Sequence, residues 1–171
     1  MIYLNIGSNL PSSNGGRKDN IEKAIKLLKK LKFNLLEISS FYETPSYPNK
    51  NDPKFINLCI KLEANLNAID FLKKIKEIEI KLGRRRLKKN EPRICDIDII
   101  DYNGEIINNN DLTIPHPRSH LRNFVIYPLK EIDPDWTHPV LNKKIDIFFL
   151  ELDKNSHNEI TRLSKSDILK S

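Results

Sequence analysis

Two aspartates, separated by one residue inside an apolar run, are the side chains of this sequence best suited to do chemistry. Residues 94–100 have the composition of a β-strand, and because side chains alternate along a strand, Asp96 and Asp98 share one face. Neighbouring carboxylates repel each other, and a hard cation such as Mg²⁺, which binds carboxylate and phosphate oxygens, relieves that repulsion. Arg93 adds a guanidinium that suits phosphate. The pattern predicts a magnesium and phosphate site; its alternative is a salt-bridged or solvated strand edge.

A basic segment with no apolar periodicity precedes this strand, and it contains Arg84, Arg85, Arg86, Lys88 and Lys89. A solvated surface loop is its simplest interpretation. Guanidinium groups match phosphate oxygens, however, and loops beside such sites commonly close over the substrate. We therefore favour a basic lid over phosphates.

Two histidines and two arginines follow in a proline-containing stretch. The spacing of His116 and His120 could suggest zinc, but Pro117 discourages a regular helix and no third cysteine or histidine lies nearby in the sequence. Contact with phosphate, together with Arg118 and Arg122, is the preferred interpretation.

The length and cysteine usage indicate one domain in a reducing compartment. A chain of 171 residues can bury a core without disulfides, and Cys59 and Cys95 lie in apolar runs without Cys-x-x-Cys spacing. The sequence begins directly with a strand pattern, and no apolar run approaches the roughly 20 residues of a membrane span. We expect a cytoplasmic protein.

The net charge of +6, from 29 Lys+Arg and 23 Asp+Glu, permits either nucleic acid or a polyphosphate substrate. Charge alone does not choose between them. No Gly-x-x-x-x-Gly-Lys-Ser/Thr motif occurs, so a nucleotide site must be assembled differently from a P-loop.

The elements that must position these side chains follow an alternating order. We expect strands at residues 2–6, 35–42, 55–63 and 93–101, and helices at residues 21–31 and 68–82. Asn67 suits the N-cap of the second helix and Gly83 suits its C-terminal end. The order βαββαβ predicts a ferredoxin-like α+β core, an antiparallel sheet with helices on one face and the other face free for ligands.

The connections and the C-terminal part are less regular. Residues 44–53 contain three prolines and form a candidate functional loop. We expect a hairpin around Asn103 and Gly104, an apolar segment at 124–129, a core position for Trp136 and a short helix at 145–150. Residues 1–152 are predicted to form a single domain, and residues 153–171 a polar C-terminal tail.

A set of short motifs in one order along the chain resembles the 6-hydroxymethyl-7,8-dihydropterin pyrophosphokinase family of folate biosynthesis. These motifs are GSNL at 7–10, SSFYETP at 39–45, FIN at 55–57, Glu79 with GRRR at 83–86, PRICDIDII at 92–100, PHPR at 115–118 and DPDW at 133–136. Each is weak alone, but together they are collinear over nearly the whole chain. The resemblance implies a ferredoxin-like enzyme that transfers the terminal diphosphate of ATP to the hydroxymethyl group of the pterin and releases AMP.

The resemblance also implies residue roles. Catalysis would involve Arg84, Arg93, Asp96 and Asp98, with the two aspartates binding two Mg²⁺ ions. ATP would contact Glu79, Arg86, Ile99, Leu112, Thr113, His116 and Arg122. The pterin would contact Thr44, Pro45, Tyr47, Phe55, Asn57 and Phe124. Because Arg85 adjoins Arg84, the choice of which guanidinium enters the site stays open.

An RRM-like RNA-binding module is the alternative from another functional class, because RRM domains share the βαββαβ order and a basic surface. Asp96 and Asp98 lie on the strand where an RRM would carry stacking rings, and no RNP1 pattern occurs. We therefore expect ATP and a pterin as small-molecule partners, no nucleic acid, no membrane and a monomer.

Overall fold

The computed structural model of the chain describes residues 1–83 and 92–165. Its strands are β1 (Ile2–Ser8), β2 (Asn34–Ile38), β3 (Ser40–Thr44), β4 (Phe55–Glu63), β5 (Asp96–Tyr102), β6 (Ile107–Asn108), β7 (Thr113–Ile114) and β8 (Thr161–Lys165). Its helices are α1 (Arg17–Lys30), α2 (Ala68–Lys81), the 3-10 turn η1 (Ser119–Leu121), α3 (Asn123–Ile132), α4 (Ile145–Glu151) and α5 (Lys154–Asn158).

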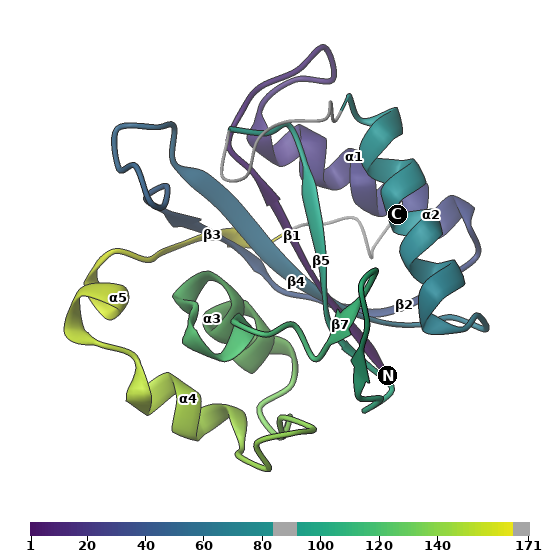
Figure 1. The fold of residues 1–171 in the computed structure, drawn as a ribbon. Coiled ribbons are helices and arrows are strands. Elements are labelled where there is room, and N and C mark those ends of the chain that lie inside the picture. Colours follow the sequence, from purple (N-terminus) through teal and green to yellow (C-terminus); the bar gives the residue numbers. More distant parts are fainter. Residues whose placement is uncertain (84–91, 166–171) are drawn as a thin grey trace.

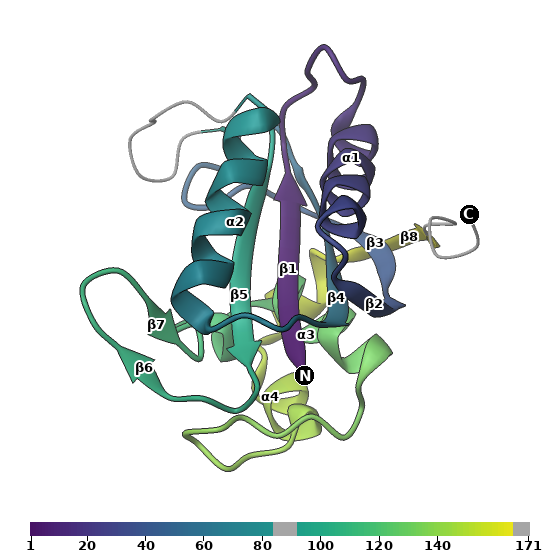
Figure 2. The same cartoon turned by 90° about the vertical axis from the view of Figure 1, so that its right-hand side faces the viewer.

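The main sheet has the strand order β5-β1-β4-β3-β8, with β2 also paired to β4, and its pairings are antiparallel (Figure 1). Helices α1 and α2 cover one face, and α3 lies on the other (Figure 2). The predicted α+β class is confirmed. The expectation of a free second face was wrong in part, because α3 packs against β3 and β4 and leaves only the remainder of that face for a ligand.

The expected strand at 35–42 is divided into β2 and β3 at Ser39. The backbone N–H of Ser39 donates to the Cys59 carbonyl (3.0 Å), while the Cys59 N–H donates to the Ser39 hydroxyl (2.9 Å). This side-chain bond replaces one bond of the strand ladder. The chain can therefore shift at Ser39 and pair with a different part of β4.

The central strand β1 supplies two cores because its side chains alternate between the faces of the sheet. Ile2, Leu4 and Ile6 join the core beneath α1 and α2. Tyr3 joins a second core with residues of α3 and α4, which includes Trp136 as predicted. The next residue on the Tyr3 face is Asn5, so a polar position follows an apolar one toward the end of the strand.

The ends of α2 agree with the sequence signals. The Asn67 side chain accepts a hydrogen bond from the Asp70 N–H (2.9 Å), which caps the helix. Gly83 follows with φ +96°, a left-handed conformation that glycine adopts without strain. These caps fix the length of α2 and hence the position of Glu79 beside β5.

The C-terminal part departs from the expectations in two places. The turn at Asn103 and Gly104 forms, and its Asn103 N–H bonds to the Met1 carbonyl, next to the pairing of β5 with β1. The paired hairpin strands that follow are β6 and β7. Residues 154–165 form α5 and β8, which the sequence did not predict. Strand β8 is held by backbone pairing with β3 rather than by a buried apolar face, so it carries no hydrophobic pattern. Among the described residues, no helix has the length and apolar character to span a membrane.

Candidate active site

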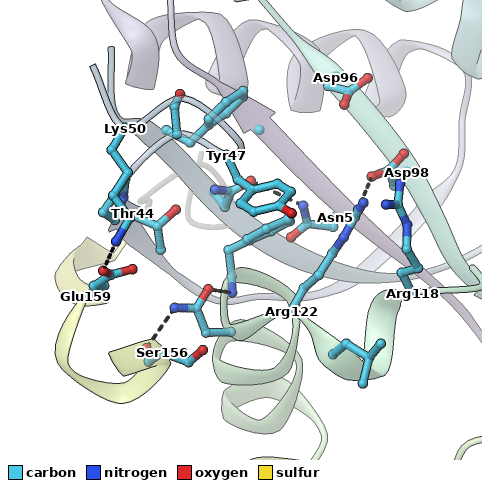
Figure 3. Close-up of a pocket in the computed structure, with 18 of the residues that line it drawn as sticks. Asn5, Thr44, Tyr47, Lys50, Asp96, Asp98, Arg118, Arg122, Ser156 and Glu159 are labelled. Carbon is cyan, nitrogen blue, oxygen red and sulfur yellow. Dashed lines mark hydrogen bonds and ion pairs between the residues drawn. The ribbon is translucent and has the colours of Figure 1, made fainter. Parts of the chain in front are cut away.

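A cavity of about 470 Å³ lies on the α3 side of the sheet, beyond the N-terminus of that helix (Figure 3). Its lining comes from β1, β4, β5, the loop after β3, the start of α3 and α5. Most of the sequence-predicted residues meet here, namely Thr44, Pro45, Tyr47, Phe55, Asn57, Arg93, Asp96, Asp98, Arg122 and Phe124. One space therefore joins the predicted metal pair to the predicted pterin contacts.

The two aspartates line the cavity from β5, while Ile97 between them is buried in the opposite core. Arg93 Nη1 lies 2.9 Å from Asp96 Oδ2, and Arg122 Nη1 lies 3.8 Å from Asp98 Oδ2. The carboxylate repulsion is thus offset by one guanidinium each. Burial lowers the pKa of Arg122, and Asp98 opposes that shift.

The donor set fits Mg²⁺ better than zinc. No group of three or more His, Cys, Asp or Glu side chains comes together anywhere in the described part of the chain. A structural or catalytic zinc site requires three or four such ligands, whereas Mg²⁺ keeps several waters and is bound through one or two carboxylates plus substrate phosphates. Asp96 and Asp98 supply that carboxylate share.

The other end of the cavity is polar and incompletely paired. Asn5 Nδ2 donates to Asn57 Oδ1 (3.3 Å), and both side chains are buried. Within the described residues, Asn5 Oδ1 and Thr44 Oγ1 are buried without a hydrogen-bond partner. Buried polar atoms normally have partners, so this end is suited to a ligand with a polar edge.

Aromatic rings and a close backbone approach shape this end. The Arg93 guanidinium lies 5.8 Å from the Phe55 ring centre, and the Arg122 guanidinium lies 5.4 Å from that of Phe124. A Cβ at Gly7 would lie 2.5 Å from Asn57 Oδ1, so a side chain there would displace Asn57. Gly7 thus lines the site, although it had no predicted role beyond its place in the GSNL motif.

Asn9 connects the cavity loop to Arg93. Its Nδ2 donates to Ser46 Oγ (3.3 Å) and to the Pro53 carbonyl (3.1 Å), which lie at the two ends of the loop at residues 45–53. Its Oδ1 accepts from the Arg93 N–H (2.7 Å), and its side chain is buried. One amide therefore fixes the loop relative to the start of β5.

Among the described residues, the predicted ATP contacts other than Arg122 lie around β5, outside the cavity lining. Glu79 is buried at the end of α2 and accepts the Ile97 N–H (2.8 Å), and the His116 N–H donates to Ile100 (3.0 Å). Ile99 and Leu112 have buried side chains in the core, and Thr113 is exposed on β7. Arg84 and Arg86, and the choice between Arg84 and Arg85, lie outside the described residues.

His116 lies in an electropositive setting. Its pKa is lowered to about 4 by burial first, and then by the nearby Arg122 and Arg118. Its Nδ1 faces the Arg118 N–H at 3.3 Å, which suits a neutral ring. At neutral pH the imidazole is therefore uncharged and can donate from Nε2.

The structure adds lining residues that carried no predicted role, among them Asn5, Lys50, Ser156 and Glu159. The lone amide of Asn5 in an apolar strand was a usable signal, since a buried amide requires partners. Arg118, for which the sequence favoured contact with phosphate, also lines the cavity. Ser156 and Glu159 had no local signal, because contacts with α3 and the pairing of β8 with β3, both distant in sequence, bring their segment to the cavity.

Comparison with known proteins identifies the family. Residues 3–134 match the family model described as 7,8-dihydro-6-hydroxymethylpterin-pyrophosphokinase (HPPK). A 2-amino-4-hydroxy-6-hydroxymethyldihydropteridine pyrophosphokinase of Aquifex aeolicus is 37% identical over 147 residues, covering 86% of this chain and 89% of that protein. The folic acid synthesis protein FOL1 of Dictyostelium discoideum is 41% identical over 161 residues, covering 92% of this chain and 24% of that protein. The chain thus spans about a quarter of the length of this relative.

Solved structures agree on the fold. The structure of Plasmodium falciparum HPPK-DHPS with pteroate has a TM-score of 0.72 and 17% sequence identity, covering 94% of this chain and 47% of that chain. The enzyme class predicted from the sequence is confirmed by the family and its named relatives, and the RNA-binding alternative receives no support. The chain belongs to the 7,8-dihydro-6-hydroxymethylpterin-pyrophosphokinase family.

Proposed function

We propose that the cavity is the site where the chain transfers the β,γ-diphosphate of ATP to the hydroxymethyl oxygen of 6-hydroxymethyl-7,8-dihydropterin. The observation that supports this assignment is that one cavity contains both a carboxylate pair, flanked by guanidinium groups, and a polar and aromatic pocket. A new bond forms between that oxygen and the β phosphorus, the α,β bridge breaks, AMP leaves and the hydroxyl proton is released.

In this assignment Asp96 and Asp98 hold two Mg²⁺ ions with the phosphates. When bound, Mg²⁺ neutralises phosphate charge and aligns nucleophile and leaving group. Arg93 has a buried Nε without a partner among the described residues, and this N–H is available to a phosphate oxygen. Arg122 and neutral His116 add donors on the same side.

Asn57, Asn5 and Thr44 form the polar end that recognises the donors and acceptors of the pterin edge. Asn57 and Asn5 already orient each other, and the spare oxygens of Asn5 and Thr44 can accept from ring N–H groups. Phe55 and Phe124 supply flat apolar surfaces for the ring, while Pro45 and Tyr47 border it from the loop. We keep Arg84 as a proposed catalytic residue. The remaining proposed ATP contacts are Glu79, Arg86, Ile99, Leu112 and Thr113.

Release of AMP tests the assignment. We expect the chain to produce AMP from ATP only when both Mg²⁺ and the pterin are present. AMP release at the same rate without the pterin, or its absence with all components, would contradict the proposal. RNA binding in place of turnover would instead favour the RRM-like alternative.

We further propose a monomer in a reducing, cytoplasmic compartment, with ATP and the pterin as its partners. Cys59 and Cys95 are buried as thiols, which supports a compartment where disulfides are not needed. Size-exclusion chromatography with light scattering would test the monomer.

A further inference from the structure

The segment after α4 lines the proposed substrate cavity although it lies beyond the family match, which ends at residue 134. Ser156 of α5 and Glu159, just after α5, both face this space (Figure 3). Ser156 and Glu159 therefore lie outside the residues that match the family model.

Contacts with α3 hold the first part of this segment. Asn123 Nδ2 donates to the Ser156 carbonyl (2.7 Å), and the Tyr127 hydroxyl lies 2.7 Å from His157 Nδ1. The Tyr127 and His157 rings also make an edge contact, with centres 5.8 Å apart. Helix α5 is thereby fixed to the helix whose start borders the cavity.

Contacts with β3 hold the second part. Strand β8 pairs with β3, and Arg162 lies 2.9 Å from Glu131 Oε1 while its Nε donates to Ser40 Oγ (3.1 Å). Glu131 is largely buried and also accepts from the Tyr42 hydroxyl (2.8 Å). Glu159 lies between these two anchored parts, so its carboxylate is held at the cavity edge.

The loop at residues 45–53 faces Glu159 across this edge. Asn9 holds its two ends, and the tip is a turn in which Asn49 Nδ2 donates to Asp52 Oδ1 (3.0 Å). Lys50 lies in this tip, and its ammonium forms an ion pair with the Glu159 carboxylate. Both residues line the cavity near Thr44 and Tyr47 (Figure 3).

We propose that Glu159 is a positioning residue for the pterin, acting through Lys50 to hold the tip of the 45–53 loop over the pterin end of the cavity. This inference rests on the proposed function. The loop carries Pro45 and Tyr47, so the position of its tip decides how closely these residues approach a bound ring. Because the side chains of Lys50 and Glu159 are 66% and 37% exposed, the pair is weak and reversible, as a loop that admits substrate requires.

Charge removal and charge exchange test the pair. We expect Glu159→Gln and Lys50→Gln each to raise the pterin KM by about two- to fivefold, the range of a partly exposed ion pair, and to leave the ATP KM and kcat within about twofold. The exchanged double variant Lys50→Glu with Glu159→Lys should restore the pterin KM. The pterin KM of the wild type should rise with ionic strength, and each single variant should lose that dependence.

Glu151→Gln is the matched control, because it breaks an exposed Lys143–Glu151 ion pair of α4 whose residues do not line the cavity. It should leave the pterin KM unchanged. Unchanged pterin KM in both single variants, or failure of the exchanged variant to restore it, would overturn the proposal.

Hydrogen exchange separates this inference from the assigned reaction. Amide exchange at residues 47–52 should be faster in Glu159→Gln than in the wild type and unaltered in Glu151→Gln. If the wild type releases no AMP, the proposed function is contradicted. The effect of the Lys50–Glu159 ion pair on the loop is then still tested by amide hydrogen exchange. Equal exchange in Glu159→Gln and the wild type would overturn the positioning role.

Discussion

At the scale of single residues, the aspartate pair is compensated before any cation binds. Arg93 and Arg122 each lie within ion-pairing reach of one carboxylate, at 2.9 and 3.8 Å. These guanidinium groups therefore reduce the repulsion between the two carboxylates that the sequence led us to expect. A metal that replaces these contacts frees the guanidiniums to meet phosphate, so the same charges serve the empty and the occupied site.

Asp96→Asn and Asp98→Asn should abolish turnover, because each removes an anionic ligand from the proposed metal site. Since each substitution also removes one ion pair, the free energy of unfolding should change by no more than about 1 kcal/mol. AMP release and urea unfolding measure the two effects. Asp135→Asn, at an 88% exposed side chain outside the cavity lining, is the control and should behave as wild type. Near-normal turnover in either site variant would exclude its carboxylate as an essential ligand.

Asn57→Ala should weaken pterin binding by about 1–3 kcal/mol and ATP binding far less. The substitution removes a ring contact and also leaves Asn5 Nδ2 without its acceptor. Titration calorimetry with each ligand separately measures both affinities. Equal losses for the two ligands would assign Asn57 a structural role instead.

His116 should make stability depend on pH. Its folded pKa is about 4, below the ordinary value of 6.5, so the folded state binds fewer protons than the unfolded state between these values. The contribution of neutral His116 to the free energy of unfolding is therefore fully present above pH 6.5 and is lost as pH decreases toward 4. The loss is at most about 3 kcal/mol, and less after solvent screening.

Urea unfolding between pH 4 and 7 tests this expectation in the wild type and in His116→Gln. The variant should show a flatter dependence, although the lowered pKa values of His120 and His138 leave part of the slope. Identical slopes in both proteins would contradict the assigned shift of His116.

At the scale of elements, the sequence predicts what periodicity and capping encode. The apolar stripe and the Asn67 cap locate α2, and alternation in β5 separates the aspartates from Ile97. The break at Ser39 and the pairing of β8 depend on partners distant in sequence, which periodicity does not contain. The predicted pterin contacts do meet in the cavity. The contribution of the segment after α4 was missed, because it too depends on partners distant in sequence.

Asn9 is the clearest link between elements, and two substitutions separate its contacts. Asn9→Asp keeps the acceptor for the Arg93 N–H but loses the donor to Ser46 and Pro53, so it should raise the pterin KM more than the ATP KM. Asn9→Ala loses both and should also lower the free energy of unfolding by about 1–3 kcal/mol. Steady-state kinetics and urea unfolding measure these effects. Equal changes of both KM values in Asn9→Asp would contradict the assignment of its amide to the loop.

At the scale of the whole molecule, one cavity joins two proposed subsites through shared residues. Arg93 borders the carboxylate end with its guanidinium and is bonded to Asn9 through its backbone, while Asn9 holds the loop at the pterin end. A ligand that orders either end therefore acts on the other. Contacts of this kind favour coupling between the two ligands. By thermodynamic linkage, each ligand must then change the affinity of the other by the same factor.

We expect a non-hydrolysable ATP analogue with Mg²⁺ to raise pterin affinity, and the pterin to raise the affinity of the analogue by the same factor. Typical coupling of about 1–3 kcal/mol corresponds to roughly 5- to 150-fold. Titration calorimetry in both orders measures the two factors. Asn9→Ala should reduce both, because it removes the connection between Arg93 and the loop. Equal pterin affinity with and without the analogue would show that the two ends bind independently, and full coupling in Asn9→Ala would place the connection in other residues.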